Sequence, residues 1–413
     1  MTQGSVSPKL KGAWLMLALA FLAQNFAIGL SIGSFGVSVL AIQSEFNTSR
    51  TLASLGGSLE ILMMGALGPL VAILMERFTI RGTMLAGVVL GSIGYVALWA
   101  APNIWVFLAA YALLVGPGVV MAGNLPGSTL VTNWFPVDTG RAIGLMMMPL
   151  FIMLVPLAST PVIEALGLRN LYLVLAAVNL LMFPLLLVVK DRPPAAELAS
   201  LKSEATAPTP APDPGVVLTI KQILTRVDFW ILVAGLGVLN GSGMVKISHL
   251  VALVAEQGRS INEATLLLTV SGGAGVVGSL VFGWLADRIG GPLALMINGL
   301  IQAATWTIFF LHPGMPLLLV DATLMGICGA GVFSAYLVTL VGLFGRASLA
   351  RALGLAGIFA MAATFAAPPV AGLLYDVSGN YGTMLTTIST ACFVAALCMG
   401  ALAFRGRGAG RVA

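Results

Sequence analysis

Long apolar stretches separated by short polar segments recur along the whole chain. Twelve of them are long enough to cross roughly 30 Å of hydrocarbon as helices. They predict helices at about residues 13–40, 52–75, 82–101, 104–131, 141–165, 169–190, 229–255, 264–287, 291–312, 315–344, 348–373 and 381–404. A membrane β-barrel would show short segments of alternating polarity instead. The pattern therefore predicts an all-α polytopic membrane protein with twelve transmembrane helices.

One long polar segment, residues 190–228, interrupts this pattern. It carries 10 of the chain's 35 formally charged side chains (20 basic and 15 acidic), and six prolines lie between Pro193 and Pro214. Such a composition buries too little apolar surface to offset the entropy of ordering it. We therefore predict three regions: an N-terminal six-helix bundle (1–189), a cytoplasmic linker (190–228) and a C-terminal six-helix bundle (229–413).

The end of this linker has a pattern of its own. The apolar residues Ile220, Ile223 and Leu224 alternate with the basic residues Lys221 and Arg226. This spacing favours a short amphipathic helix on the membrane surface. A featureless linker is the alternative.

Composition supports the membrane assignment. Hydrophobic residues make up 59% of the chain and charged residues 8%, against about 25% charged in soluble domains. The first apolar stretch lacks a small-residue cleavage site, so we expect a retained span, not a signal peptide. The cysteines Cys328, Cys392 and Cys398 lie in apolar stretches without CxxC spacing, so no disulfide, metal framework or cofactor is expected.

The basic residues sort by membrane side. With the N-terminus inside, 16 of the 20 fall in cytoplasmic segments: Lys9, Lys11, Arg77, Arg81, Arg141, Lys190, Arg192, Lys202, Lys221, Arg226, Arg288, Arg346, Arg351, Arg405, Arg407 and Arg411. The outer loops carry Arg50, Arg169 and Arg259, and Lys246 lies within a span. This asymmetry predicts that both termini are cytoplasmic. It also explains the net charge of +5 without a nucleic-acid partner.

The two halves of the chain repeat one another. Three pairs of segments recur at offsets of 211, 210 and 212 residues: 72–77 with 283–288, 141–144 with 351–354, and Gly167 with Gly379. Two parallel six-helix repeats with a site between them at mid-membrane are typical of transporters. The repeats therefore predict two pseudo-symmetric bundles.

These paired loops resemble the G-x-x-x-D-R-x-G signature of the major facilitator superfamily. The second half has it intact, as Gly283, Asp287, Arg288 and Gly290, whereas in the first half Ala72, Glu76 and Thr79 replace three of its residues. An acid and an arginine at a helix end can bind neighbouring helix termini through charge and dipole. The resemblance thus implies a cytoplasmic gating motif formed by Glu76, Arg77, Asp287, Arg288, Arg141 and Arg351.

Other loops resemble the monocarboxylate-porter and oxalate/formate-antiporter branch of that superfamily. Residues 45–50 match E-F-x-x-S-R, residues 134–144 match its W-F-P…R-G-x-A-x-G with the Arg and Gly transposed, and residues 368–381 match P-P-x-x-G…D-x-x-G-x-Y. Members of this branch carry a substrate-binding arginine in the helix predicted at 264–287. Ser279 occupies that position here, so either Lys246 and His249 bind the anion instead, or the substrate is not a simple monocarboxylate.

Ionisable residues at bilayer depth are costly and usually face a functional cavity. Lys246 and His249 share a helix face at i, i+3, after a glycine-containing segment, Asn240–Met244, that we expect to break the helix. A cation beside an imidazole can bind an organic anion and respond to a proton. Alternatively, the Lys246 side chain extends to the membrane interface or forms a structural ion pair with an acidic residue.

Two acidic residues are candidates for proton coupling, as is His249. Asp321 either carries the proton or forms a salt bridge with Lys246, and Glu60 either carries the proton or makes a packed polar contact. Neutral candidates for the cavity, each with interhelical bonding as the alternative, are Gln24, Asn25, Asn124 and Tyr336.

The leading prediction is a secondary active transporter of a small monocarboxylate-like anion, coupled to protons, that works by alternating access. The alternative is an exporter of amphipathic or drug-like compounds, which the missing arginine and the methionine-containing helices favour. Anion transport should need Lys246, whereas export of a neutral or cationic compound should not.

A third class, a receptor without transport activity or a membrane-bound enzyme, would need a soluble domain or a clustered nucleophile and base. The chain has two histidines and no HExxH or GxSxG motif, so no enzymatic activity is expected. The expected location is the bacterial inner membrane. The expected partners are the lipid bilayer, the anion and the proton, with the monomer as the functional unit.

Overall fold

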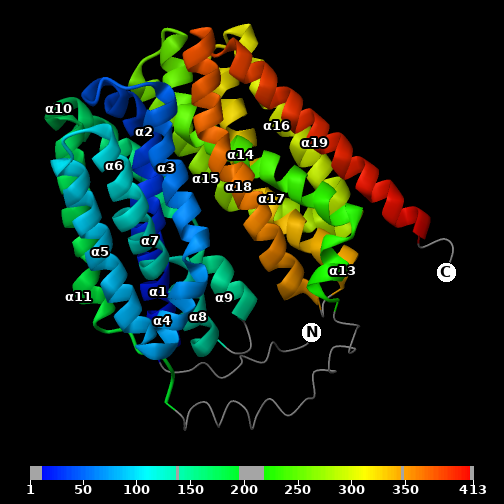
Figure 1. Cartoon of the computed structure of the whole chain (residues 1–413), viewed down its shortest axis with the longest axis horizontal. Helices are drawn as coiled ribbons and strands as arrows, with labels where there is room; N and C mark the ends of the chain where they lie inside the picture. The colour runs from blue at the N-terminus through cyan, green and yellow to red at the C-terminus, as the bar shows by residue number, and fades with distance from the viewer. Residues whose placement is uncertain (1–11, 136–138, 195–217, 346–347, 410–413) are drawn as a thin grey trace, which may run out of the picture.

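The computed structural model describes residues 12–135, 139–194, 218–345 and 348–409, and the elements listed below lie within these ranges. Figure 1 shows them as two groups of helices, the first coloured blue to green and the second green to red. The first group comprises α1 (Ala13–Gln24), η1 (Asn25–Gly29), α2 (Leu30–Glu45), α3 (Arg50–Ala66), α4 (Gly68–Arg77), α5 (Ile80–Ala100), α6 (Ile104–Ala110), η2 (Tyr111–Val115), α7 (Gly116–Ala122), α8 (Asn124–Trp134), α9 (Thr139–Met146), α10 (Leu150–Leu180) and α11 (Met182–Leu186). The second comprises α13 (Ile220–Leu224), α14 (Val227–Glu256), α15 (Ile261–Ile289), α16 (Gly291–Ile308), η3 (Phe309–Leu311), α17 (Met315–Phe344), α18 (Leu349–Ser378) and α19 (Gly382–Ala409).

These elements form twelve spans in the part of the chain that the structure describes. Ten helical stretches are long and apolar enough to cross a membrane, and α3 with α4 forms another that is bent by 51°. The stretch Arg141–Leu186 is two spans, because α10 turns at Gly167, where φ is 83°. The predicted fold class, an all-α membrane protein with two six-helix bundles, is confirmed.

Turn chemistry explains where several helices begin and end. Ser260 opens α15 with a capping box, in which its hydroxyl accepts from the Glu263 backbone and the Glu263 carboxylate accepts from the Ser260 backbone. Gly167 and Gly379, the paired glycines of the internal repeat, both have positive φ, at 83° and 72°. Only glycine adopts this left-handed backbone without a steric cost, so each position ends one helix and permits the next.

Each group of helices buries its own apolar residues. One core cluster extends from Ala13 to Val189, and a second, from Ile223 to Leu402, lies within the other group. A third cluster joins the α14–α19 helices at their other end and takes in Val37 of α2. The predicted domain boundaries, 1–189, 190–228 and 229–413, stay a prediction, because linker residues 195–217 lie outside the described residues.

The two bundles pack closely at one end of the molecule. This end carries the α2–α3 turn and the last turn of α18, and we call it the upper end, as it lies in Figure 1; the lower end carries the α4–α5 turn and α13. Two glycines allow close approach here: a Cβ on Gly36 would lie 2.3 Å from the Ile247 carbonyl oxygen, and one on Gly372 would lie 2.7 Å from the Thr51 backbone. Helix backbones therefore touch across the bundle interface at the upper end.

The amphipathic segment at the end of the linker is helical, as predicted. Thr219 and Gln222 form a capping box at the start of α13, and Ile223 is fully buried. The Leu218 backbone bonds to Ser348 and to the Arg351 guanidinium at the start of α18. The α13 segment is therefore bonded to the lower end of the second bundle. Its contact with a membrane surface stays a prediction.

Candidate functional site

A cavity of about 510 Å³ lies between the two bundles. The first bundle contributes lining residues from α2, α3 and the start of α10, and the second contributes them from α14, α15, α17 and α18. The lining reaches Tyr336, Leu353 and Gly357, which lie toward the lower ends of α17 and α18. The cavity thus extends from mid-span toward the lower end, whereas the bundles touch at the upper end.

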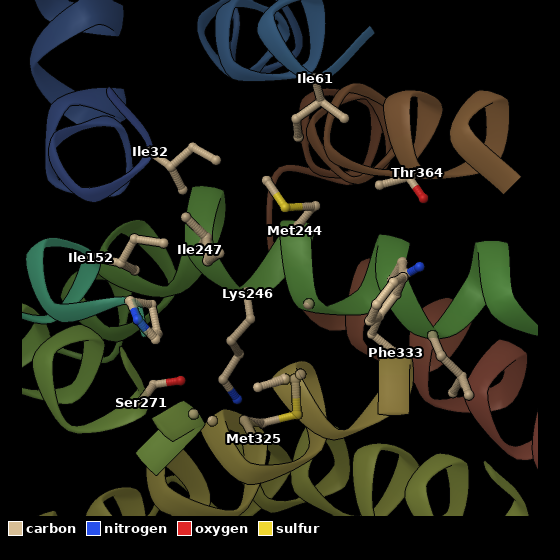
Figure 2. Close-up of a pocket in the computed structure, with 18 of the residues that line it drawn as sticks. Ile32, Ile61, Ile152, Met244, Lys246, Ile247, Ser271, Met325, Phe333 and Thr364 are labelled. Atoms are coloured by element: carbon tan, nitrogen blue, oxygen red, sulfur yellow. The ribbon is translucent and has the colours of Figure 1, made fainter. Parts of the chain in front are cut away.

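Lys246 is the one charged side chain among the described residues that line this cavity. It is 3% exposed, and its Nζ lies 2.7 Å from Oδ2 of Asp321, which is 1% exposed. Figure 2 shows the lysine side chain reaching from α14 toward Met325 of α17. Asp321 is not part of the lining, so the acid lies behind the lysine as seen from the cavity. Of the two alternatives left open for Asp321, the structure shows the ion pair, and its role as a proton carrier stays a prediction.

Two aromatic rings flank the ammonium group of Lys246. Its Nζ lies 4.5 Å from the ring centroid of Trp306 and 4.3 Å from that of Phe309. The Trp306 indole N–H donates to Ser242 at 2.8 Å, which fixes the ring. Ring faces attract a cation more strongly when water is excluded, so these contacts favour a charged lysine in a buried position.

His249 does not share the cavity with Lys246. It is fully buried, and its Nδ1 lies 3.2 Å from the Tyr381 hydroxyl while its Nε2 lies 3.0 Å from the Pro368 carbonyl oxygen. Burial raises the pKa of Tyr381, so its hydroxyl stays protonated. The imidazole therefore bonds to α18 at Pro368 and, through Tyr381, to the loop that follows α18. Its predicted roles in substrate binding and proton coupling stay predictions.

The expected break in the helix around Asn240 is wrong, because α14 is continuous from Val227 to Glu256. The glycines serve close packing instead. A Cβ on Gly241 would lie 2.8 Å from Ala367, and one on Gly237 would lie 2.7 Å from Ala363. These residues bring α14 against α18 and leave Asn240 in the cavity lining.

Glu60 is fully buried in the first bundle, and its Oε2 accepts a hydrogen bond of 2.6 Å from Ser31. Its Oε1 has no hydrogen-bond partner among the described residues. The neighbouring residues Ile32 and Ile61 line the cavity, whereas Glu60 and Ser31 do not. The carboxyl group therefore lies behind the cavity wall, and its coupling role stays a prediction.

Of the neutral candidates, Tyr336 lines the cavity, and its buried hydroxyl has no partner among the described residues. Gln24, Asn25, Asn124 and Ser279 lie outside this lining. Asn25 bridges the break between α9 and α10, donating to the Met148 carbonyl and accepting from the Phe151 N–H. Its amide thereby satisfies the Phe151 N–H and adds a second donor to the Met148 carbonyl, which also accepts from the Leu150 N–H.

The residues of the predicted gating motif lie toward the lower end, on α4, α9, α15 and α18. Glu76, Arg77, Asp287 and Arg288 are exposed, and the Arg288 guanidinium lies over the Trp284 ring on its own helix, 4.6 Å from the centroid. Arg141 and Arg351 are exposed too, and Arg351 bonds the Leu218 carbonyl. A gating role for these six residues stays a prediction.

The upper end joins two loop motifs that the sequence analysis had found separately. Asp376 accepts hydrogen bonds from the backbone N–H groups of Arg50 and Thr51, both at 3.0 Å, and from the Thr51 hydroxyl. The Arg50 guanidinium lies over the Tyr375 ring, 3.8 Å from the centroid, and its Nη1 is 3.9 Å from Glu256. A carboxylate of the second bundle therefore caps α3 of the first.

Sequence reasoning missed several residues of this site. Trp306 and Phe309 looked like ordinary apolar residues of a span, although their i, i+3 spacing places both on one helix face. Ser271 and Thr364, which line the cavity, carried no signal among many hydroxyl residues in spans. For the Asp376 cap, the sequence showed two separate loop motifs, residues 45–50 and 368–381, but gave no sign that they are in contact.

Comparison with known proteins shows which sequences and structures this chain resembles. The sequence matches the family model described as the Major Facilitator Superfamily over residues 21–254 and 237–412. It is 27% identical to monocarboxylate transporter 6 of Homo sapiens over 412 residues, covering 94% of this chain and 79% of that one. It is 25% identical to the uncharacterized MFS-type transporter YcxA of Bacillus subtilis over 294 residues, covering 69% of this chain and 67% of that one.

A solved structure shares the fold. It is the crystal structure of a bacterial homologue of the human lysosomal transporter Spinster, in an inward-facing and unoccupied conformation. The TM-score is 0.66 at 16% sequence identity, covering 95% of this chain and 94% of that one. At this identity the likeness concerns the fold alone.

Proposed function

The chain belongs to the Major Facilitator Superfamily, and we propose that it is a secondary active transporter that moves a small organic anion together with a proton. One observation carries this proposal: the buried ion pair of Lys246 and Asp321 at the wall of a cavity shared by both bundles. The similarity to proteins named monocarboxylate transporters supports an anionic substrate.

Charge balance in the low-dielectric site would couple binding of the anion to binding of a proton. An anion that binds the Lys246 ammonium must displace the Asp321 carboxylate, which would then be a buried charge without a partner. Breaking a buried pair in this way costs about 3–5 kcal/mol. If Asp321 takes up a proton as the anion arrives, one lysine cation faces one anion and no charge is left unpaired. Loss of that proton restores the original pair and favours release of the anion.

Alternating access would require the contact between the bundles at the upper end to break. The cavity extends toward the lower end, and the bundles are held together above it by the Asp376 cap and by a hydrogen bond of 2.7 Å between Thr160 and Thr265. Rocking of one bundle against the other would break these contacts and open the cavity upward. We propose that the lower end faces the cytoplasm of a bacterial cell, and the concentration of basic residues in the segments on that side supports this orientation. We take the monomer as the functional unit, because the cavity is built from a single chain.

Glu60 and His249 are the other proton-coupling candidates, and both differ from Asp321 in position. Neither lies against a basic residue of the cavity lining, since Glu60 bonds Ser31 and His249 bonds Tyr381 and Pro368. A proton on either group would not directly release the Lys246 ammonium. Asp321 is therefore the carrier that we propose.

Export of amphipathic compounds is the second candidate. The cavity lining favours it, because most of its side chains are apolar, among them Ile61, Met244 and Phe333. A neutral or cationic compound would gain no ionic interaction with the Lys246 ammonium group. The two functions are therefore separated by the requirement for this lysine.

Uptake into proteoliposomes tests the proposal. Labelled lactate, pyruvate, oxalate, short fatty acids and aromatic acids would be offered with and without an inward proton gradient. We expect gradient-driven uptake of at least one acid by the wild type, and its loss in Lys246→Met. Lys221→Met, at an exposed lysine of α13, is the matched control and should transport normally.

The acidic residues are compared in the same assay. Asp321→Asn should retain exchange of the anion across the bilayer but lose acceleration by the proton gradient, whereas Glu60→Gln should keep that acceleration. The reverse result would move the proton site to Glu60. Uptake that does not change in Lys246→Met would reject the proposed anion site and favour the exporter.

A further inference from the structure

We infer that the transported anion is a monocarboxylate with a bulky apolar body, such as an aryl or branched-alkyl group, and that short hydroxy acids and dicarboxylates are poor substrates. The inference rests on the proposed function, because it assigns the carboxylate to Lys246. It adds the chemical class of the rest of the molecule.

The charge of the site limits the ligand to one carboxylate. Lys246 is the one charged side chain among the described lining residues. The helix in which members of the monocarboxylate-porter branch carry a substrate-binding arginine is α15, and here it contributes the uncharged residues Leu268, Ser271, Gly272 and Gly275. A second carboxylate on the ligand would enter the cavity without an ionic partner. Buried charges without a partner are strongly disfavoured, so dicarboxylates are selected against.

The walls of the site select for apolar bulk. Figure 2 shows Ile32 and Ile61 of the first bundle across from Met244, Ile247, Met325 and Phe333 of the second. The cavity volume of about 510 Å³ falls in the roughly 300–1,000 Å³ range of sites for drug-sized ligands. A short acid bound at Lys246 would leave most of these apolar walls facing water, whereas a larger body would cover them.

The few polar groups and the flexible side chains fit the same ligand. Ser271 and Thr364 reach the cavity in Figure 2, and the Tyr336 hydroxyl has no hydrogen-bond partner among the described residues. These groups suffice to orient one polar headgroup. The rings of Phe333 and Tyr336 lie 6.3 Å apart by their centroids, and the thioether of Met244 can adapt to different body shapes. The site therefore discriminates by bulk more than by hydrogen-bond pattern.

Calorimetric binding to the purified full-length chain in detergent tests this inference without interference from passive leak across a bilayer. The probes are 3-phenylpropionate, propionate, lactate, phenylsuccinate and 3-phenylpropionamide. Each buried methylene strengthens binding by about fourfold, so the phenyl body should improve binding at least about 30-fold over propionate. Lactate, phenylsuccinate and the amide should each bind at least about tenfold more weakly than 3-phenylpropionate.

Variants locate the effect in the cavity. Phe333→Ala should weaken 3-phenylpropionate about tenfold and leave propionate nearly unchanged. Phe393→Ala, at an exposed phenylalanine of α19 outside the lining, is the matched control. Lys246→Met should weaken both acids and leave the amide unchanged.

The outcomes separate the inference from the proposed function. Propionate or lactate binding as tightly as 3-phenylpropionate, in a Lys246-dependent manner, would overturn the bulky-body inference and leave anion transport intact. Phenylsuccinate binding best would overturn the single-carboxylate inference. The amide binding as well as the acid, or no acid binding at all, would overturn the proposed function itself.

Discussion

Asp376 caps the first turn of α3 by accepting from the backbone N–H and the hydroxyl of Thr51, a residue 325 positions earlier in the chain. The contact joins the last turn of α18 in the second bundle to a helix of the first. It lies at the upper end, where Gly372 also brings the two backbones together. Any motion that opens the cavity upward must break this cap.

Replacing Asp376 with asparagine should weaken the closed upper end. The amide keeps the size of the side chain but loses the negative charge at the helix N-terminus and one acceptor oxygen, a loss of about 0.5–2 kcal/mol. We expect a population with separated upper ends to grow by roughly 2–30-fold. Distances between spin labels at Ser44 and Asn262, two exposed positions on opposite bundles, would report it.

The control for this experiment is an exposed acid at the same end. Glu45→Gln changes a carboxylate whose ion pair, with Arg169, stays within the first bundle. It should leave the distance distribution unchanged. A distribution that is the same in Asp376→Asn and the wild type would show that the cap does not hold the bundles together.

Replacing Gly372 with alanine should act on the same contact by volume alone. The added methyl group would lie 2.7 Å from the Thr51 backbone, closer than packed atoms tolerate. Overpacking of this kind costs about 1–3 kcal/mol, and separating the bundles relieves it. The spin-label distances should therefore lengthen. Gly354→Ala, on the same helix with no atom within 4 Å of the added carbon, should leave them unchanged.

The Lys246–Asp321 pair should behave as one unit in a stability cycle. Lys246→Met or Asp321→Asn alone leaves a buried charge without its partner and should destabilise the protein by about 3–5 kcal/mol. The double variant leaves no unpaired buried charge and should recover most of that loss. Thermal unfolding of the purified variants in detergent measures the coupling. Losses that simply add would show that the two charges do not interact.

Trp306 should tune the proposed anion site through Lys246. Trp306→Leu removes a ring face from the ammonium group and the hydrogen bond to Ser242, with the cation–π part worth about 0.5–2 kcal/mol. We expect the KM for the transported acid to rise several-fold. Trp306→Phe keeps a ring and should restore part of the affinity. Trp105→Leu, at an exposed tryptophan of α6, should leave the KM unchanged.

The apolar pattern of the sequence predicted the fold closely. Predicted spans such as 264–287 and 315–344 correspond to α15 at Ile261–Ile289 and α17 at Met315–Phe344. The reason is physical: a span needs about 20 apolar residues and an unbroken set of backbone hydrogen bonds, and both are local properties of the sequence. Gly167 and Gly379 marked turns correctly, because a positive φ is also a local requirement.

The candidate site was only partly predictable. The sequence pointed to Lys246, because a charge within a span is rare and costly. The spacing of Lys246 and His249 placed both on one helix face, but in the structure one pairs with Asp321 of α17 and the other bonds the loop after α18. Three residues along a helix turn the side chain by less than a full turn, and this difference directs the two groups to different neighbours.

The sequence by itself thus determined that the chain is a twelve-helix membrane protein with an internal repeat and a few buried charges. Only the tertiary structure decided that Asp321 is the partner of Lys246, that Trp306 and Phe309 flank it, and that Asp376 caps α3. In a membrane, lipid is as apolar as the helix interior, so the hydrophobic pattern does not reveal which face of a helix packs inward. Helix rotation and pairing depend on close packing between distant segments, and this is why the cavity and its contacts appeared only in three dimensions.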